Sequence, residues 1–413
     1  MPAAPAQPVT ATVLGTEHRA SPRALVAATL TLVLAFAVSS SPVPLFTTYR
    51  RADGLTDGDF SLATVAYFAG TILALLVLGR LSTHLGRRPL ALAAAAALLL
   101  AGALVMLRVD SLAPLALGRF LSGLGCGIAS SAVMSYVVDA APRRPAWLAT
   151  MITSQSPMVG LTLGAFGSGL LVEHGPRPTT TVFLVGAGAM TLCLLALAIA
   201  PETGPRLRGA LASLRPRVAV PVAARPLLPA LAAVVVSTWA MGSFYQAFGP
   251  SVVADGLGTD DAVVFAVVFS AYMLPSVLGA PVGGRMCIRT AQRTGMALFA
   301  IGVLGVLTAL ALDSVVLFIA ASIVAGAGQG MAMSASVRSV LSTATPAETA
   351  PTMAAVYLLS YSGAMAASLV SGQLTRWYGV EQIVIGYGAL AVAAAVVTAL
   401  CAREPRPVEA PAA

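Results

Sequence analysis

Long apolar stretches recur along the whole chain and are separated by short polar segments. Each stretch has about the twenty residues that cross a bilayer as a helix, the conformation in which the backbone satisfies its own hydrogen bonds in hydrocarbon. The stretches lie at residues 24–46, 60–82, 89–107, 112–137, 147–171, 179–200, 227–250, 262–284, 294–312, 315–340, 348–374 and 381–402. The pattern predicts an all-α membrane protein with twelve transmembrane helices.

Two features of this pattern repeat along the chain. A basic segment at 79–89 follows the second stretch, and a degenerate copy at 284–293 follows the eighth. Alternate glycines at 123, 125 and 127 in the fourth stretch return at 326, 328 and 330 in the tenth. The similar offsets predict two pseudo-symmetric six-helix bundles, an architecture used by transporters with a substrate site between the halves. The expected parts are a tail at 1–23, bundles at 24–200 and 227–402, a cytoplasmic linker at 201–226 and a tail at 403–413.

Composition and charge agree with a membrane protein. Charged residues make up 10% of the chain and hydrophobic residues 58%, whereas a soluble domain has about 25% charged residues. The net charge is +8, and all 24 basic residues are arginine. With the N-terminus inside, cytoplasmic segments hold 18 of these arginines and external segments five. The positive-inside rule therefore predicts that both termini are cytoplasmic. The charge is explained by topology, so no nucleic-acid partner is expected.

The sequence offers no constellation for catalysis or for a resident cofactor. The four cysteines and three histidines are scattered without metal-ligand spacing. All 16 acidic residues fall in loops, in tails or near helix ends. We therefore expect neither an enzyme nor a metal site. The absence of a carboxylate at mid-membrane also means that the local residues give little support to proton coupling, which commonly uses a buried acid.

The basic segment resembles the signature of the major facilitator superfamily between its second and third helices. The matching residues are Gly79, Leu81, Gly86, Arg87 and Arg88. Thr83 stands where that family usually has Asp, and His84 where it has Arg or Lys; Ile288 takes the Asp position in the second copy. In the family this Asp helps to hold the two halves together on the cytoplasmic side. The resemblance implies a gating loop here whose acidic latch has changed.

Two further segments resemble bacterial twelve-helix drug/proton antiporters of that superfamily. The segment 115–125 is similar to their helix-four motif, in which the arginine matching Arg119 is associated with proton transfer. An arginine within a membrane is costly and hence a functional candidate. The alternatives are that Arg119 bonds backbone carbonyls structurally or snorkels to the surface. In the fifth stretch Pro157, Gly160 and Gly164 partly match the antiporter motif, which implies a hinge, although Ser156 and Leu161 replace glycines.

The substrate cavity is expected between the halves, as the resemblance implies. Its candidate lining residues are polar or aromatic: Tyr67, Gln155, Trp239, Tyr245, Gln246, Tyr272, Gln329, Tyr357 and Tyr361. Such a wall suits a small amphipathic, aromatic or neutral molecule. The segment 39–44, with three serines and two prolines, is expected to break the first helix or end it.

The function expected from these features is export of such molecules by proton antiport. The exporter would lie in the bacterial inner membrane, in contact with lipid, and act as a monomer without a cofactor other than the proton gradient. The alternatives are an uptake permease for a neutral metabolite and a membrane receptor or scaffold without transport.

Overall fold

The computed structural model describes residues 21–405 except 102–104, 143, 146, 205–206, 217 and 346–347. This part of the chain is helical and contains no strand. The predicted tails at 1–23 and 403–413 lie largely outside the described residues.

The first half and the linker contain α1 (Pro22–Ser40), η1 (Val43–Leu45), α2 (Phe46–Asp53), α3 (Asp57–Leu73), η2 (Ala74–Leu78), α4 (Ser82–Leu85), α5 (Arg87–Leu100), η4 (Met106–Arg108), α6 (Leu112–Ile128), η5 (Ala129–Val133), α7 (Met134–Ala140), α8 (Trp147–His174), α9 (Pro178–Ile199), α10 (Ala210–Ser213) and η6 (Val222–Leu227). The second half contains α11 (Leu228–Ala247), α12 (Gly249–Ser251), η7 (Val252–Gly256), α13 (Ala262–Met273), α14 (Ser276–Gly284), α15 (Ile288–Ala311), α16 (Val315–Leu341), α17 (Thr349–Leu374) and α18 (Val380–Cys401).

These elements group into the twelve predicted spans, because short turns such as η2 and η5 continue the helices that precede them. Ten helices of the described chain are long and apolar enough to cross a membrane, by length and composition. The spans built on α5 and α8 complete the twelve. Large apolar side chains cover the outer surface; Ile199, Val316 and Leu400 are each more than three-quarters exposed. Such a surface is expected to face lipid.

Helix ends follow from local chemistry. Thr56 and Asp59 form a capping box at the start of α3, each side chain accepting the other's backbone N–H. The first span breaks after Ser40, as the segment 39–44 predicts, because Pro42 and Pro44 lack an N–H donor. Beyond the break, α2 extends to Asp53, past the predicted end at residue 46.

One predicted boundary is wrong in the second half. The ninth helix, α15, begins at Ile288 rather than at residue 294. The second basic segment, predicted as a loop, therefore forms the first turns of this helix. Its N-terminus is stabilised by the carboxylate of Glu404, which accepts the backbone N–H of Arg289 at 2.8 Å.

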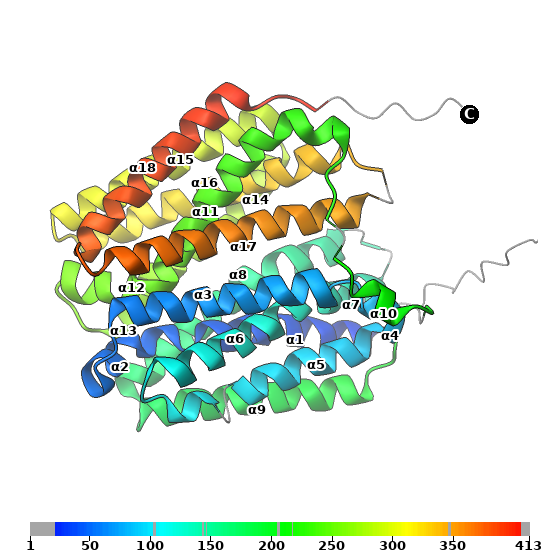
Figure 1. Ribbon diagram of the computed structural model, residues 1–413, viewed down its shortest axis with the longest axis horizontal. Helices are drawn as coiled ribbons and strands as arrows, with labels where there is room; N and C mark the ends of the chain where they lie inside the picture. Colours follow the sequence, from blue (N-terminus) through cyan, green and yellow to red (C-terminus); the bar gives the residue numbers. More distant parts are fainter. Residues whose placement is uncertain are drawn as a thin grey trace, which may run out of the picture.

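The two halves lie side by side (Figure 1). Elements α1–α9 form one half and α11–α18 the other, and they meet where α3 packs on α17 and α8 on α13. At one end of the molecule lie α2, α12 and the start of α13, which we call the Arg50 end. At the opposite end lie α4, α7, α10 and the C-terminal segment, which we call the Arg87 end. The sequence predicts that the Arg87 end is cytoplasmic.

The alternate glycines bring each half's central helix against two neighbours. A Cβ added to Gly123 would lie 2.0 Å from the Tyr67 carbonyl oxygen on α3, and one added to Gly326 would lie 2.1 Å from the Tyr272 carbonyl oxygen on α13. On the other face, Gly125 lies against Leu98 of α5. Gly328 lies equivalently against Phe299 of α15. The repeated glycines thus allow the same close packing in both halves, as expected for small residues between membrane helices.

Candidate substrate and coupling site

Arg119 is a fully buried cation that bridges the two halves. From α6, its Nη1 donates to the Ser39 carbonyl at the end of α1, at 2.6 Å, and its Nη2 to Oε1 of Gln246 on α11, at 3.2 Å. Its Cζ atom lies 4.6 Å from the centre of the Tyr67 ring, within cation–π distance. The Nε atom has no acceptor. The side chain is buried, so the alternative that Arg119 snorkels to the surface is wrong. The alternative of a structural bond to backbone carbonyls describes the bond to Ser39 but not the contacts with Gln246 and Tyr67.

Aromatic side chains continue from Arg119 across the interface between the halves. The ring of Tyr67 lies 5.4 Å from Phe68, and Phe68 on α3 lies 6.0 Å from Tyr361 on α17. Trp239 packs edge-on against Tyr361 at 4.5 Å, and Tyr357 lies 6.4 Å from the same ring. Trp239 and Tyr357 are half-buried. Four of the predicted cavity residues thus meet in one aromatic cluster. Phe68, which the sequence analysis did not single out, connects the parts of this cluster that belong to the two halves.

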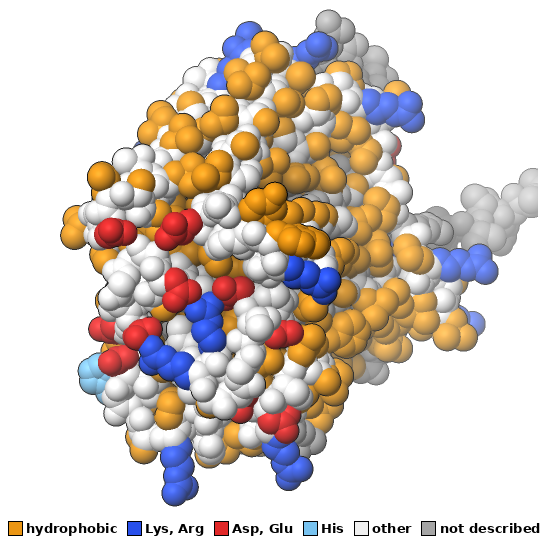
Figure 2. Space-filling model, turned by 60° about the vertical axis from the view of Figure 1, so that its left-hand side comes forward, with side chains coloured by type: hydrophobic (Ala, Val, Ile, Leu, Met, Phe, Trp, Pro, Cys, Tyr) orange, Lys and Arg blue, Asp and Glu red, His pale blue; other side chains and the backbone are white. Residues whose placement is uncertain are grey.

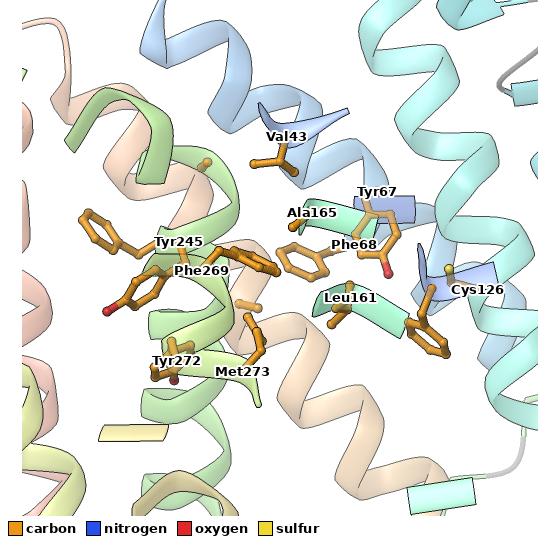
Figure 3. Packing of buried hydrophobic residues seen from close by; sticks show 14 of the residues in the cluster. Val43, Tyr67, Phe68, Cys126, Leu161, Ala165, Tyr245, Phe269, Tyr272 and Met273 are labelled. Atoms are coloured by element: carbon orange, nitrogen blue, oxygen red, sulfur yellow. The ribbon is translucent and has the colours of Figure 1, made fainter. Parts of the chain in front are cut away.

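Other predicted cavity residues are packed elsewhere. Tyr245 and Tyr272 are fully buried and stack with centroids 4.6 Å apart, within the second half (Figure 3). Their hydroxyls bond to Ser322 Oγ and the Thr238 carbonyl. In this state they are core residues.

Two predicted glutamines also lie outside the aromatic cluster. Gln155 on α8 is half-buried and donates to the neighbouring Ser154. Gln329 on α16 is buried, and its Oε1 has no partner. The structure therefore gathers only part of the predicted cavity wall around Arg119.

At the Arg50 end, charged residues tie the halves together. Arg50 on α2 bonds Asp57 of its own half, and Asp255 and Ser251 of the other; its Nη1 lies 2.7 Å from Asp255 Oδ2. Arg51 forms an ion pair with Asp260 of the second half. Figure 2 looks toward this end, where acidic and basic side chains gather beside the apolar surface. We call the pairs Arg50–Asp255 and Arg51–Asp260 the Arg50 latch.

Further contacts close the same end. The Ser61 hydroxyl donates to the Ser368 carbonyl at 2.5 Å, and Glu173 accepts the backbone N–H of Ala262 at 3.3 Å. A surface hollow of about 370 Å³ beside them is lined by residues including Arg51, Glu173 and Asp260, and by none of the predicted cavity residues. Sequence reasoning placed these charges in external loops but did not pair them. The sequence could have indicated this pairing, because Arg50 and Arg51 and a group of aspartates fall at the same end of the molecule.

The basic segment forms a tight turn within the first half. Gly86 has φ +104°, a left-handed conformation that favours glycine, whereas Gly79 has an ordinary right-handed one. Only the second glycine therefore makes a sharp turn. The Glu202 carboxylate accepts the backbone N–H groups of Arg87 and Arg88 at 2.8 and 3.2 Å, at the start of α5.

The side chains of the segment are bound in the same half. Arg87 pairs with Asp139 at 2.8 Å, and Arg88 donates to the Ala198 carbonyl. Thr83 donates to the Arg80 carbonyl, and His84 Nδ1 lies 3.2 Å from the carbonyls of Leu207 and Arg208 in the linker. Among the described residues, the hydrogen bonds and the ion pair of this segment stay in the first half or its linker. A gating role for it remains a prediction.

The three residues predicted as a hinge lie on α8, which is continuous through Pro157. Added Cβ atoms at Gly160 and Gly164 would lie 2.4 Å and 1.9 Å from the Val33 and Ala37 carbonyl oxygens on α1. These glycines therefore bring α8 and α1 into close contact. Ser40 strengthens the contact by donating to the Leu161 carbonyl. The hinge itself remains a prediction.

The charge around Arg119 is not balanced by an acid. Among the described residues Arg119 is the only buried charged side chain, and no Asp or Glu is buried. The described acids lie outside the core, as Glu348 does in the connection between α16 and α17. Hydrogen bonds from the backbone and side chain of Thr345 lower the pKa of Glu348. The described His, Cys, Asp and Glu residues form no group of three that could hold a metal ion.

Two repeated six-helix halves, joined by a linker and bridged at their interface by a buried arginine, define a membrane transporter. The family model of the Major Facilitator Superfamily matches residues 28–267 and 230–413. The chain belongs to this superfamily, whose members are transporters rather than enzymes. The resemblance of the basic segment to this superfamily is thereby confirmed, whereas the antiporter class that the helix-four motif indicates remains a prediction.

Individual relatives are more distant. A protein of Rickettsia bellii (strain RML369-C), described as an uncharacterized transporter, is 28% identical over 174 residues, which are 41% of this chain and 40% of that protein. The multidrug resistance protein MdtL of Klebsiella pneumoniae subsp. pneumoniae is 24% identical over 155 residues, 37% of this chain and 38% of that protein. The chain thus spans about two fifths of the length of these curated relatives.

A solved structure shares the fold over most of the chain. The partially occluded, inward open structure of the xylose transporter XylE from E. coli has a TM-score of 0.68 and 18% sequence identity, covering 92% of this chain and 98% of that one. At this identity the likeness supports the fold alone.

Proposed function

We propose that this transporter exports small amphipathic or aromatic compounds from the bacterial cytoplasm by alternating access, in exchange for protons. The observation that carries the proposal is the interface around Arg119. A buried cation and a contiguous aromatic cluster lie where the two halves meet, and both change surroundings when the halves rock. Similarity to the multidrug resistance protein MdtL and the antiporter-like helix-four motif support export rather than uptake.

The part of Arg119 in proton coupling would be electrostatic. A guanidinium does not lose its proton in proteins, so Arg119 would act by favouring or opposing a charge that arrives beside it. The aromatic cluster offers the apolar surface. Trp239 and Tyr357 are half-buried and continue this apolar surface beyond the buried Tyr361. This combination suits a molecule with a planar apolar body and a polar group.

The proposal is tested by expression in a bacterial strain that lacks its own efflux pumps. We expect the native protein to lower the accumulation of aromatic dyes and antibiotics, and a protonophore to abolish the difference. Arg119→Ala should abolish it as well, whereas Gly386→Ala, at a position with open space around it, should not. Equal accumulation with and without the protein across a broad compound panel would refute export. Concentrative uptake into vesicles would instead support the permease alternative.

A further inference from the structure

The acceptors around Arg119 are all neutral. They are a backbone carbonyl, an amide oxygen and an aromatic face, and its Nε is buried without an acceptor. Taking a cation out of water is costly unless an opposite charge or enough hydrogen bonds compensate it. No described carboxylate is buried, so none within the bundle compensates this cation. The site therefore carries one uncompensated positive charge.

Packing alone does not require this charge. Gly123 and Gly326 occupy equivalent positions, since each lies against the carbonyl oxygen of a tyrosine on the neighbouring helix. Four residues before each glycine stand Arg119 in the first half and Ser322 in the second. The Ser322 hydroxyl lies 2.6 Å from the Tyr245 hydroxyl and donates to the Phe318 carbonyl. The second half thus builds the same helix contact with neutral groups only.

The bond from Arg119 to Gln246 joins the halves in a state whose Arg50 end is closed. Gln246 is the penultimate residue of α11, and Ser39 that of α1, so the contact lies toward the Arg50 end. When the halves separate at this end, α11 moves away from α6 and the amide oxygen leaves the guanidinium. Arg119 then lacks the one side chain of the described chain that accepts a hydrogen bond from it. An anionic group that has reached Arg119 from the Arg87 end would replace this neutral acceptor with a charged one, which makes a stronger hydrogen bond, and would remain beside Arg119 when Gln246 leaves.

We propose that Arg119 binds an anionic group of the transported molecule, and that the substrates are amphipathic monoanions. A single buried cation matches a single negative charge. The cluster of Tyr67, Phe68, Tyr361 and Trp239 then receives the apolar body of the substrate. A cationic substrate finds no buried carboxylate in the described chain and is repelled by Arg119. This inference rests on the proposed function and adds the charge class of the substrate to it.

The test uses the purified full-length protein with three probes that share one ring system: naphthalene sulfonate, naphthalene sulfonamide and naphthyl trimethylammonium. Binding is measured in detergent and transport in proteoliposomes. We expect the sulfonate to bind about tenfold tighter than the other two, and to be the best transported. Arg119→Gln should weaken sulfonate binding about thirtyfold and leave sulfonamide binding within about twofold. Arg119→Lys keeps the charge and should retain the preference for the sulfonate.

A second variant keeps the arginine and tests whether Arg119 binds the anionic group even if Arg119→Gln does not fold. Gln246→Glu places a carboxylate of nearly the same shape against Arg119, so the protein supplies its own anion. We expect this variant to fold with equal or higher melting temperature, to lose the preference for the sulfonate, and to bind the sulfonamide as the native protein does. A purely structural role for Arg119 predicts no change in probe preference.

The two proposals fail in different ways. Transport in which the sulfonamide or the ammonium probe equals or exceeds the sulfonate overturns the monoanion inference and leaves export intact. A sulfonate preference that survives Gln246→Glu also overturns it. Failure of all three probes to bind, together with unchanged dye accumulation in the pump-deficient strain, overturns the proposed function itself.

Discussion

The Arg50 latch sets how readily the halves separate at that end, and its contribution can be estimated from exposure. Asp255 and Asp260 are 64% and 56% exposed, and their arginine partners 28% and 64%. Ion pairs this exposed each contribute about 0.2–1 kcal/mol. Removing both cross-half pairs should therefore favour the open state by about 1 kcal/mol, a population shift of about fivefold.

The perturbation is the double variant Asp255→Asn with Asp260→Asn. It removes the carboxylates of both cross-half ion pairs and leaves Arg50 bound to Asp57 of its own half and to Ser251 of the other. The control is Asp313→Asn, an acid at the same end that is exposed and forms no ion pair with the described residues. The control changes charge at this end without breaking the latch.

The assay measures how fast a buried reporter cysteine reacts with a membrane-impermeant maleimide. Val43→Cys is a suitable reporter, because Val43 is fully buried and its turn η1 packs on α13 of the other half. The more accessible native Cys287 and Cys401 are replaced by serine in the background. We expect the double variant to react about fivefold faster than the background, if labelling follows the open population, and the control to react at the background rate.

Salt provides a second readout of the same quantity. At 1 M salt the Debye length falls to about 3 Å, so exposed ion pairs are largely screened. The rate difference between the double variant and the background should then shrink toward zero. Labelling at the background rate in low salt would refute the conclusion that these pairs hold the halves together.

Three glycine-to-alanine substitutions give further predictions. Gly123→Ala directs a Cβ to 2.0 Å from the Tyr67 carbonyl and should destabilise the protein by about 1–3 kcal/mol, seen as a lower melting temperature in detergent. In Gly386→Ala the added Cβ meets open space, so this variant should stabilise the protein by up to about 1 kcal/mol. Equal melting temperatures for the Gly123→Ala and Gly386→Ala variants would contradict the packing argument. Gly86→Ala combines φ +104° with a Cβ 2.4 Å from Glu202 Oε2 and should cost at least about 1–3 kcal/mol, whereas a melting temperature equal to the native one would show that the turn can relax.

The fold could be predicted from the sequence because its signals are local. Twenty apolar residues identify a span wherever it packs, and the prolines after Ser41 break the first helix by lacking donors. The alternate glycines predicted close packing before their partners were known. Helix boundaries depend on distant residues as well: α15 starts before its predicted boundary, where Glu404, over a hundred residues away, stabilises its first turn.

The site was harder to predict because its partners are distant in sequence. Arg119 was identified from its cost in the membrane, but its acceptors Ser39 and Gln246 lie 80 and 127 residues away. No periodicity indicates such pairs. Tyr245 and Tyr272 have the residue type of a cavity wall and yet stack within one half. Residue type alone does not say which face of an apolar helix meets the interface.

The charges at the two ends of the molecule are unequal, and this bears on the direction of transport. Thr83 replaces the acid that in the family helps to hold the halves together at the Arg87 end, and in this chain it bonds its own segment. At the Arg50 end, by contrast, Arg50 and Arg51 reach across to the other half. Ion pairing in the described chain therefore favours the state closed at the Arg50 end. With the predicted orientation that state faces the cytoplasm, and it is the state in which the proposed exporter would collect its substrate.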